Sequence, residues 1–345
     1  MLALNEAEIQ VLIAAQRTAE AQRPLTREAL TGRAGDFCRY LVDWQQAFDT
    51  LAARELLVPG DGGLRLTERG AADAHRLAEE RPEMWYWYRQ YYEVTRDSPA
   101  HAAFCERVYG RNLCQHGFAD MAQLDKLIEV SALGPGDRAL DLGCGNGLIA
   151  EYISDRTGAH VTGIDNIPEA IAQAHERTLA KRSRLAFEVH DMARLESLPG
   201  PFDTIISIDT LYFVKEDEVV PKIKSLLAPG GRIAILWDHS LWDPATNWRE
   251  RALTEAPPFP RESLQADKTP MAARLRRLGL AFQAWDLTEA HYQHALRRQA
   301  ALADLRADFE AEGNQFLYQN RLDEANGERA ILAAGLACRY LYLAK

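Results

Sequence analysis

The sequence predicts an α/β protein with a mostly helical N-terminal domain and a larger domain built on a parallel sheet with helices on both faces. Two observations support this. From Asp137 onward, β-prone apolar runs alternate with helical stretches, as in βαβ units. Before that point, the chain reads as short helices and one hairpin. With 345 residues, the chain also exceeds one typical domain.

Within the first 80 residues, the apolar residues of "NEAEIQVLIAAQRTAEA", which starts at Asn5, follow helical spacing. Asn5 and Glu8 form a capping-box pattern at its start. "LTREALTGRAG" and "DFCRYLVDWQQAFDTLAAREL" are expected to be a second and a third helix. "LLVPGDGGLRLT" then places two β-prone runs around a Pro-Gly-Asp-Gly-Gly turn, which predicts a hairpin.

Three helices followed by a hairpin resemble a winged helix, and Leu66 to Gly70 resembles the end of the wing. Winged helices either bind DNA or form dimers, and a DNA reader needs Lys or Arg to face the phosphates. The third helix instead mixes acids with few bases and has an apolar face. Its acids are Asp36, Asp43 and Asp49, its bases Arg39 and Arg54, and its apolar residues Phe37, Leu41, Trp44 and Phe48. We therefore predict a winged-helix-like dimerisation domain over residues 1–80, a homodimer, and no nucleic-acid partner.

Residues 81–130 are predicted to be a helical linker and active-site cap. Six aromatic residues fall within "EMWYWYRQYYE", which suits either packing between domains or a wall over a planar or cationic substrate. We select Trp85 and Tyr88 as substrate-binding candidates. Tyr109 and His116, in "VYGRNLCQHGFADM", are candidates for contact with the substrate or closure over a cofactor.

Residues 131–345 carry the predicted sheet. Its expected strands are "RALDLG", "HVTGID", "LAFEVHD", "FDTIISID", "GRIAILW", "AFQAWDLTEAH" and the final "CRYLYLAK". "TPMAARLRRLGL" is expected to be a helix, and a helical insertion of about residues 292–336 precedes the last strand. The insertion is a candidate lid.

The glycine-rich turn after the first of these strands reads "LDLGCGNG". It lacks the Gly-Lys-Ser/Thr of a phosphate-binding P-loop and the spacing of a dinucleotide fingerprint. Asp141 at the strand end suits a ligand with an ammonium or sulfonium group and would repel a pyrophosphate. Asp165 and Asp191 end the next two strands, where the first suits ribose hydroxyls and the second an adenine amino group. Met192 can pack on the purine.

At these residues the sequence resembles the class I S-adenosylmethionine-dependent methyltransferases. "GID", "HDM", "FDTIISID" and "LLAPGGRIAI" resemble the later motifs of that family in order and spacing. The resemblance implies S-adenosyl-L-methionine as cofactor and a Rossmann-like seven-stranded sheet with a reversed last strand. It also implies that Gly143 and Gly145 approach the methionine moiety, that Asp165 binds the ribose hydroxyls, and that Asp191 with Met192 binds the adenine. Asn166 is a further cofactor-binding candidate.

The acceptor is expected to be a small molecule of specialised metabolism with an N, O or C nucleophile. The fourth strand is followed by "SIDTLYFV", which lacks the Asn/Asp-Pro-Pro-Tyr/Phe motif of enzymes that methylate amino groups of nucleic acids and proteins. Asp209 is expected beside the cofactor and Tyr212 beside the substrate. His116 and His239 are the candidate general bases, although an isolated histidine is more often structural.

Composition sets the remaining expectations. A net charge of -10 disfavours a polyanionic partner, and no apolar run approaches the roughly 18 residues of a membrane span. Five cysteines without a C-x-x-C pair suggest free thiols and no metal site, and the N-terminus lacks a signal-peptide pattern, so we predict a cytoplasmic enzyme. Two alternatives stay open: a winged-helix DNA-binding regulator that senses S-adenosylmethionine, and an aminopropyl transferase.

Overall fold

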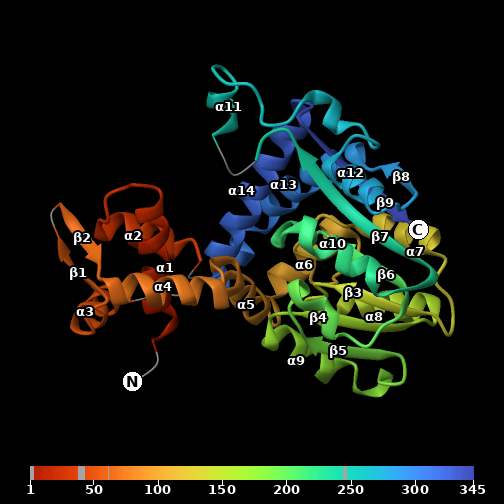
Figure 1. Cartoon of the computed structure of the whole chain (residues 1–345), viewed down its shortest axis with the longest axis horizontal. Helices are drawn as coiled ribbons and strands as arrows, with labels where there is room; N and C mark the ends of the chain where they lie inside the picture. The colour runs from red at the N-terminus through yellow and green to blue at the C-terminus, as the bar shows by residue number, and fades with distance from the viewer. Residues whose placement is uncertain (1–3, 38–42, 61, 244–246) are drawn as a thin grey trace. The chain divides into compact units, whose positions relative to one another are not determined.

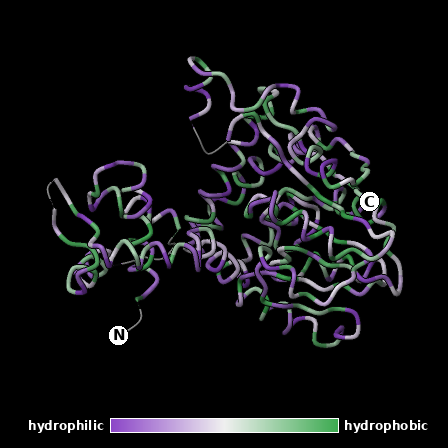
Figure 2. The backbone as a smooth tube through the Cα atoms, in the orientation of Figure 1, coloured by the Kyte–Doolittle hydropathy of each residue, from purple (hydrophilic) through white to green (hydrophobic). Residues whose placement is uncertain are grey.

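The computed structural model describes residues 4–37, 43–60, 62–243 and 247–345. The chain divides into two compact units, Met1–Val94 and Thr95–Lys345, which are treated separately (Figure 1). No helix in the described ranges combines the length and apolar character needed to cross a bilayer. Figure 2 shows hydrophilic and hydrophobic residues interleaved along the helices of both units, as expected for helices with one buried face.

The N-terminal unit has the predicted order of helices and hairpin. Val11, Leu30, Phe48 and Leu51 are among the buried residues of its core. The strands pair in antiparallel fashion from Leu57↔Leu66 to Gly60↔Gly63, which confirms the hairpin. Its elements are α1 (Glu6–Glu20), α2 (Arg27–Gly35), α3 (Trp44–Ala53), β1 (Leu57–Gly60), β2 (Gly63–Leu66), α4 (Glu68–Glu80) and α5 (Glu83–Thr95).

Local sequence sets the boundaries of these helices. Asn5 and Glu8 form the predicted capping box: the Glu8 amide donates to Asn5 Oδ1 at 2.9 Å, and the Asn5 amide donates to Glu8 Oε2 at 3.0 Å. The third helix begins later than expected, since Asp36 is the C-cap of α2 and Asp43 is the N-cap of α3. Arg39 and Leu41 lie outside the described residues. The sequence analysis also missed α4, which Thr67 caps.

The aromatic helix α5 belongs to the N-terminal unit. Arg89 and Gln90 donate to the two carboxylate oxygens of Glu6 at 2.8 and 2.7 Å, and Arg33 makes a two-fold contact with Glu83 at 2.8 and 2.7 Å. The units therefore divide at Val94 rather than after residue 80, and residues 81–130 do not form a body of their own. The helices that follow, α6 (Pro99–Tyr109) and α7 (Met121–Ser131), lie in the second unit.

A seven-stranded sheet forms the centre of the second unit, in the order β5-β4-β3-β6-β7-β9-β8. The strands from β5 to β7 are parallel, whereas β9 runs antiparallel to both of its neighbours, so the reversed last strand is confirmed. The strands are β3 (Arg138–Leu142), β4 (His160–Asp165), β5 (Leu185–Val189), β6 (Phe202–Ile208), β7 (Leu227–Ser240), β8 (Phe282–Asp286) and β9 (Ala337–Ala344).

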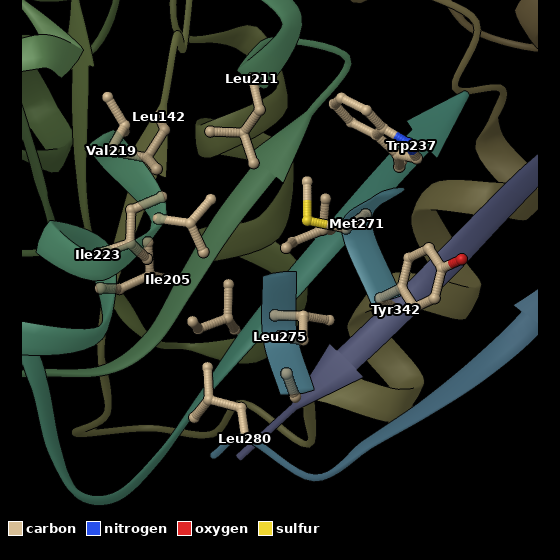
Figure 3. Packing of buried hydrophobic residues seen from close by; sticks show 14 of the residues in the cluster. Leu142, Ile205, Leu211, Val219, Ile223, Trp237, Met271, Leu275, Leu280 and Tyr342 are labelled. Atoms are coloured by element: carbon tan, nitrogen blue, oxygen red, sulfur yellow. The ribbon is translucent and has the colours of Figure 1, made fainter. Parts of the chain in front are cut away.

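Helices cover both faces of this sheet. On one face, α10 (Glu216–Ser225) and α12 (Pro270–Arg277) contribute Ile223, Met271 and Leu275 to a cluster with strand residues such as Ile205 and Trp237 (Figure 3). On the other face, α7, α8 (Leu148–Thr157) and α9 (Pro168–Arg177) pack against apolar strand side chains. This arrangement is the predicted α/β architecture.

The insertion between β8 and β9 is a pair of helices, α13 (Thr288–Ala311) and α14 (Gln315–Ala333), which lie side by side. It begins at Thr288, a few residues before the expected start at residue 292. Helix α6 packs against α13. The sequence analysis also missed a long connection between β7 and α12, which carries the short helix α11 (Trp248–Arg251).

Candidate active site

The glycine-rich turn joins β3 to α8 at the carboxyl edge of the sheet. Gly143, Gly145 and Gly147 have φ angles of 70°, 54° and 75°, in the left-handed region that favours glycine. A Cβ at Gly143 would lie 2.6 Å from Thr210 Cγ2, and one at Gly147 would lie 2.4 Å from Phe187 Cε1. The turn thus needs glycine for conformation and for space, which keeps its backbone accessible to a ligand.

Two of the predicted acids flank this turn. Asp165 accepts from the Gly145 amide at 2.8 Å and from the Ile167 amide at 3.0 Å, one bond on each carboxylate oxygen. Asp141 is 3% exposed, and no hydrogen bond reaches its carboxylate from the described part of the chain. Burial, reinforced by the charge of Asp165, raises the pKa of Asp141 to about 7. A cation at the turn would offset the free-energy cost of keeping the buried Asp141 carboxylate ionised. The residues present therefore fit a ligand with an ammonium group.

Asp191 and Met192 lie near the same edge. The amide of His190 donates to the Asp165 carbonyl at 2.9 Å, which brings the ends of β4 and β5 together. Asp191 caps a short 3-10 helix by accepting from the Ala193 amide at 2.8 Å, and its side chain is 50% exposed. Met192 is partly buried against the core. The structure therefore places both side chains along the edge that Asp165 occupies.

Asp209 has a different role from the predicted one. Arg339 donates to its two carboxylate oxygens at 2.7 and 3.1 Å, and the Phe118 amide donates to Oδ2 at 2.7 Å. Asp209 is 5% exposed. Its carboxylate is therefore engaged within the protein, and we no longer assign it to the cofactor.

The two predicted tyrosines of this unit differ. Tyr109 is buried, and its hydroxyl donates to the Gly117 carbonyl at 2.8 Å, while burial raises its pKa to about 12. It therefore supports the loop before α7, and the structure gives no support to direct substrate contact. Tyr212 is 42% exposed and packs beside Phe213, with ring centroids 4.6 Å apart. It follows the end of β6, where it is able to meet an acceptor.

Both candidate bases are weak ones in this structure. Burial lowers the pKa of His116 to about 3, against the opposing charge of Glu324, whose Oε1 lies 3.3 Å from His116 Nε2. Burial, with the charge of Arg274, lowers the pKa of His239 to about 4. Nε2 of His239 lies 2.8 Å from Ser263 Oγ. Each imidazole stays neutral at pH 7 but binds a proton poorly, and both have structural partners.

Sequence reasoning missed a histidine between two carboxylates. His291 on α13 is 1% exposed; its Nδ1 lies 3.1 Å from Asp238 Oδ1 on β7, and its Nε2 lies 3.4 Å from Glu328 Oε2 on α14. Burial, reinforced by Asp238, raises the pKa of Glu328 to about 7, although His291 opposes the shift. The Asp238 and Glu328 side chains are 22% and 16% exposed, so solvent reaches them.

A signal for this group was present in the insertion. His291, His294 and Arg298 recur at helical spacing on α13, and Arg321, Glu324 and Glu328 do so on α14. Such a polar stripe on a helix is usually solvated, but here Arg298 and Arg321 are fully buried and Arg298 donates to Glu324. A polar stripe on each of two adjacent helices was therefore the available indication of a buried polar network.

Trp85 and Tyr88 lie on α5 in the N-terminal unit. The rings of this helix pack on one another: Trp87 and Tyr88 lie edge to face with centroids 5.0 Å apart, and Trp87 stacks on Tyr91 at 5.4 Å. This packing accounts for much of the aromatic run. A role of Trp85 and Tyr88 toward substrate stays a prediction.

Residues 139–231, which include the glycine-rich turn and the three strand-end acids, match the family model of the methyltransferase domain. This part of the chain is a methyltransferase domain. The expected motifs from "LDLGCGNG" to the turn after α10 lie within this match, and the sheet order and reversed β9 agree with the fold that the family resemblance implied.

Curated relatives cover this domain in part. The chain is 37% identical to a ubiquinone biosynthesis O-methyltransferase of Xylella fastidiosa (strain M23) over 102 residues, which make up 29% of this chain and 41% of the relative. It is 29% identical over 231 residues to a trans-aconitate 2-methyltransferase of Delftia acidovorans (strain DSM 14801 / SPH-1), a match that covers 57% of this chain and 82% of that one. The first match thus spans less than half the length of that relative.

A solved structure agrees with the fold. Phosphoethanolamine N-methyltransferase 2 of Haemonchus contortus, in complex with phosphomonomethylethanolamine and S-adenosylhomocysteine, superposes with a TM-score of 0.59 at 18% identity. The superposition covers 74% of this chain and 59% of that protein. At this identity the likeness concerns the fold.

Proposed function

We propose that the protein is an enzyme that transfers a methyl group from S-adenosyl-L-methionine to a small-molecule acceptor. The observation that carries the proposal is the pair of acids at the glycine-rich turn, one oriented by backbone amides and one buried without a hydrogen-bond partner in the described residues. The match to the methyltransferase domain supports it. The named methyltransferases among the relatives act on small molecules, which supports the acceptor class.

In this proposal, different residues of the chain bind different parts of the cofactor. Asp141 faces the ammonium group of the methionine moiety, and the backbone at Gly143 and Gly145 lies against that moiety. Asp165 and Asn166 accept hydrogen bonds from the ribose hydroxyls, and Asp191 and Met192 contact the adenine. When bound, the cofactor supplies a methyl group on a sulfonium; the acceptor atom attacks this carbon as the carbon–sulfur bond breaks, and sulfur keeps the electron pair.

An acceptor that reacts through a hydroxyl or an N–H group also has to lose a proton, and the pKa values favour Glu328 as the base. A general base works best when its pKa lies near the working pH. The pKa of Glu328 is about 7, whereas those of His116 and His239 are about 3 and 4. His291 lies between Glu328 and Asp238.

Calorimetry with S-adenosylmethionine and S-adenosylhomocysteine tests the cofactor assignment. Binding should raise the melting temperature, because a ligand of the native state stabilises it by mass action. Asp165→Ala should weaken binding strongly, while Asp203→Ala should not, because the half-buried Asp203 lies at the start of β6, away from the carboxyl ends of the strands. Absence of binding by the wild-type protein would refute the proposal.

The acceptor is best sought by transfer of a labelled methyl group to a panel of small molecules. A compound with a hydroxyl group, a phosphorylated amino alcohol and a tricarboxylate correspond to the O-methyltransferase, phosphoethanolamine and trans-aconitate in the names of similar proteins. We retain the proposals that the acceptor belongs to specialised metabolism, that the insertion covers the pocket, and that Trp85 and Tyr88 bind the acceptor. Trp85→Ala and Tyr88→Ala should then lower turnover with little effect on cofactor affinity.

A further inference from the structure

We propose that Arg339 is a positioning residue for the cofactor loop: it holds Asp209 and, through it, the segment against which the glycine-rich turn packs. The assignment deepens the proposed function, on which it rests for the identity of the ligand. Arg339 lies on β9, two strands away from β6 in the sheet and nearly two hundred residues beyond the turn in sequence. None of the sequence motifs indicated such a link.

The Arg339 side chain is fully buried and joins β9 to three other segments. Besides its two bonds to Asp209 at the end of β6, its Nε donates to Gln123 Oε1 on α7 at 2.8 Å, and Nη1 also donates to Asp238 on β7. Burial by itself would lower the pKa of Arg339, but Asp209 and Asp238 raise it, so the guanidinium stays charged. The fork of a guanidinium suits such multiple contacts, whereas an ammonium group cannot reproduce them.

Asp209 connects Arg339 to the glycine-rich turn. Its φ angle of 54° is unusual for a residue with a side chain, so its backbone conformation needs support from its surroundings. Arg339 and the Phe118 amide supply that support by holding the carboxylate. The next residue, Thr210, donates from Oγ1 to the Leu142 carbonyl at 3.0 Å, and its Cγ2 occupies the space that a Cβ of Gly143 would need.

The same carboxylate fixes the loop before α7. A Cβ at Gly117 would lie 2.6 Å from Asp209 Oδ2, so the loop passes directly over this group. Loss of Arg339 would leave Asp209 as a buried carboxylate with one backbone donor, a costly state that is relieved by rotation toward solvent. Thr210 and the Gly117 loop would then move, and the glycine-rich turn would lose a packing surface.

The test compares Arg339→Lys and Arg339→Met with Arg298→Met, a matched control. Arg298 is equally buried, and both guanidinium groups lie over the Phe118 ring, at 5.4 Å for Arg298 and 5.8 Å for Arg339. Arg298, however, is ion-paired to Glu324 on α14 and not to Asp209, so the control isolates the contact with Asp209. Two quantities are measured at a temperature at which circular dichroism shows every variant folded: the dissociation constant of S-adenosylhomocysteine, and amide hydrogen exchange of residues 143–147 without ligand.

We expect both Arg339 variants to bind S-adenosylhomocysteine about 3- to 30-fold more weakly, with faster exchange at the turn. The control should lose stability and keep both quantities within about twofold. The double variant with Asp209→Asn and Arg339→Gln, a neutral pair, should regain part of the affinity lost in Arg339→Met.

An Arg339 variant with native exchange at residues 143–147 and native affinity, however unstable, would overturn the proposal. So would an Arg298 control that shows the same losses, because Arg339 would then act through general stability alone. If the wild-type protein does not bind S-adenosylhomocysteine, the proposed function fails, and the exchange comparison without ligand still decides the role of Arg339.

Discussion

Two carboxyl groups in this protein are poorly solvated. Asp141 and Glu328 both have a pKa raised to about 7, mainly by burial, and we propose the first as a partner of the cofactor and the second as the base. Raised carboxyl pKa values concentrate at functional sites because a ligand or a transferred proton compensates for the lost hydration. The two residues therefore give separate tests, one of cofactor binding and one of proton transfer.

Replacement of Asp141 should separate stability from binding. Its native pKa lies above its usual value, so its stabilising contribution is present below about pH 4 and is lost as the pH rises to about 7. Asp141→Asn should thus be more stable than the wild type at pH 8, by about 2 to 4 kcal/mol, with no advantage at pH 4. Urea denaturation without ligand at the two pH values measures this.

The same variant should bind S-adenosylmethionine about 10- to 100-fold more weakly, since an amide cannot pair with the ammonium group. Wild-type binding should tighten from pH 6 to pH 8, as Asp141 ionises. An Asp141→Asn protein that is both less stable at pH 8 and fully able to bind would contradict the role assigned to this carboxylate.

Replacement of Glu328 should change the pH dependence of turnover. With an N or O acceptor, kcat/KM of the wild type should rise with an apparent pKa near 7. Glu328→Gln should remove that rise and lower kcat/KM about 100-fold or more, with cofactor affinity unchanged. Glu328→Asp is the matched control and should keep a titrating limb. A rise near pH 7 that persists in Glu328→Gln would assign the base elsewhere.

Elements of the N-terminal unit depend on close backbone contact between α4 and the segment before β1. A Cβ at Gly70 would lie 1.9 Å from the Leu56 carbonyl oxygen, so α4 can pack there only with glycine. Gly70→Ala should destabilise the N-terminal unit by about 1 to 3 kcal/mol. Gly32→Ala, at a helical glycine with nothing within 4 Å, should be neutral or stabilising. Equal melting curves for the two variants would contradict this packing.

At the level of elements, the sequence predicted most of the fold and only part of the site. Strand-end acids follow apolar runs directly, so Asp141, Asp165 and Asp191 were visible as a series. Helix α4 was missed because Leu66 to Gly70 was interpreted as the end of a wing, although Thr67 is a good N-cap. Asp238, His291 and Glu328 come from three elements distant in sequence, and no local pattern joins them.

The site residues for which the structure gives no support share a feature. Asp209 and Tyr109 occupy positions that suit a ligand, but Arg339 and the Gly117 carbonyl, which lie elsewhere in the chain, already engage their polar groups. For His116 and His239, the sequence shows a titratable ring but not the burial that lowers its pKa. Partners and burial are tertiary properties, and a sequence pattern does not contain them.

For the whole molecule, we predict that the N-terminal unit makes a homodimer and does not bind DNA. Because the units divide at Val94, removal of residues 1–94 is a better test than removal of the first 80. Light scattering should show a dimer for the full chain and a monomer or aggregates after removal. Salt-sensitive binding of the full chain to duplex DNA would contradict the prediction and favour the regulator alternative.

The position of β9 also has a consequence for biosynthesis. In the described sheet β8 pairs with β9 and not with β7, although β8 is synthesised before β9. During translation, β8 therefore has no partner strand until residues 337–344 have left the ribosome. Until then, the edge of β7 that pairs with β9 is also unpaired. Arg339 is part of β9, so the glycine-rich turn acquires its distant support only once this strand has been synthesised. A nascent chain arrested before β9 should accordingly expose a sheet edge that chaperones recognise.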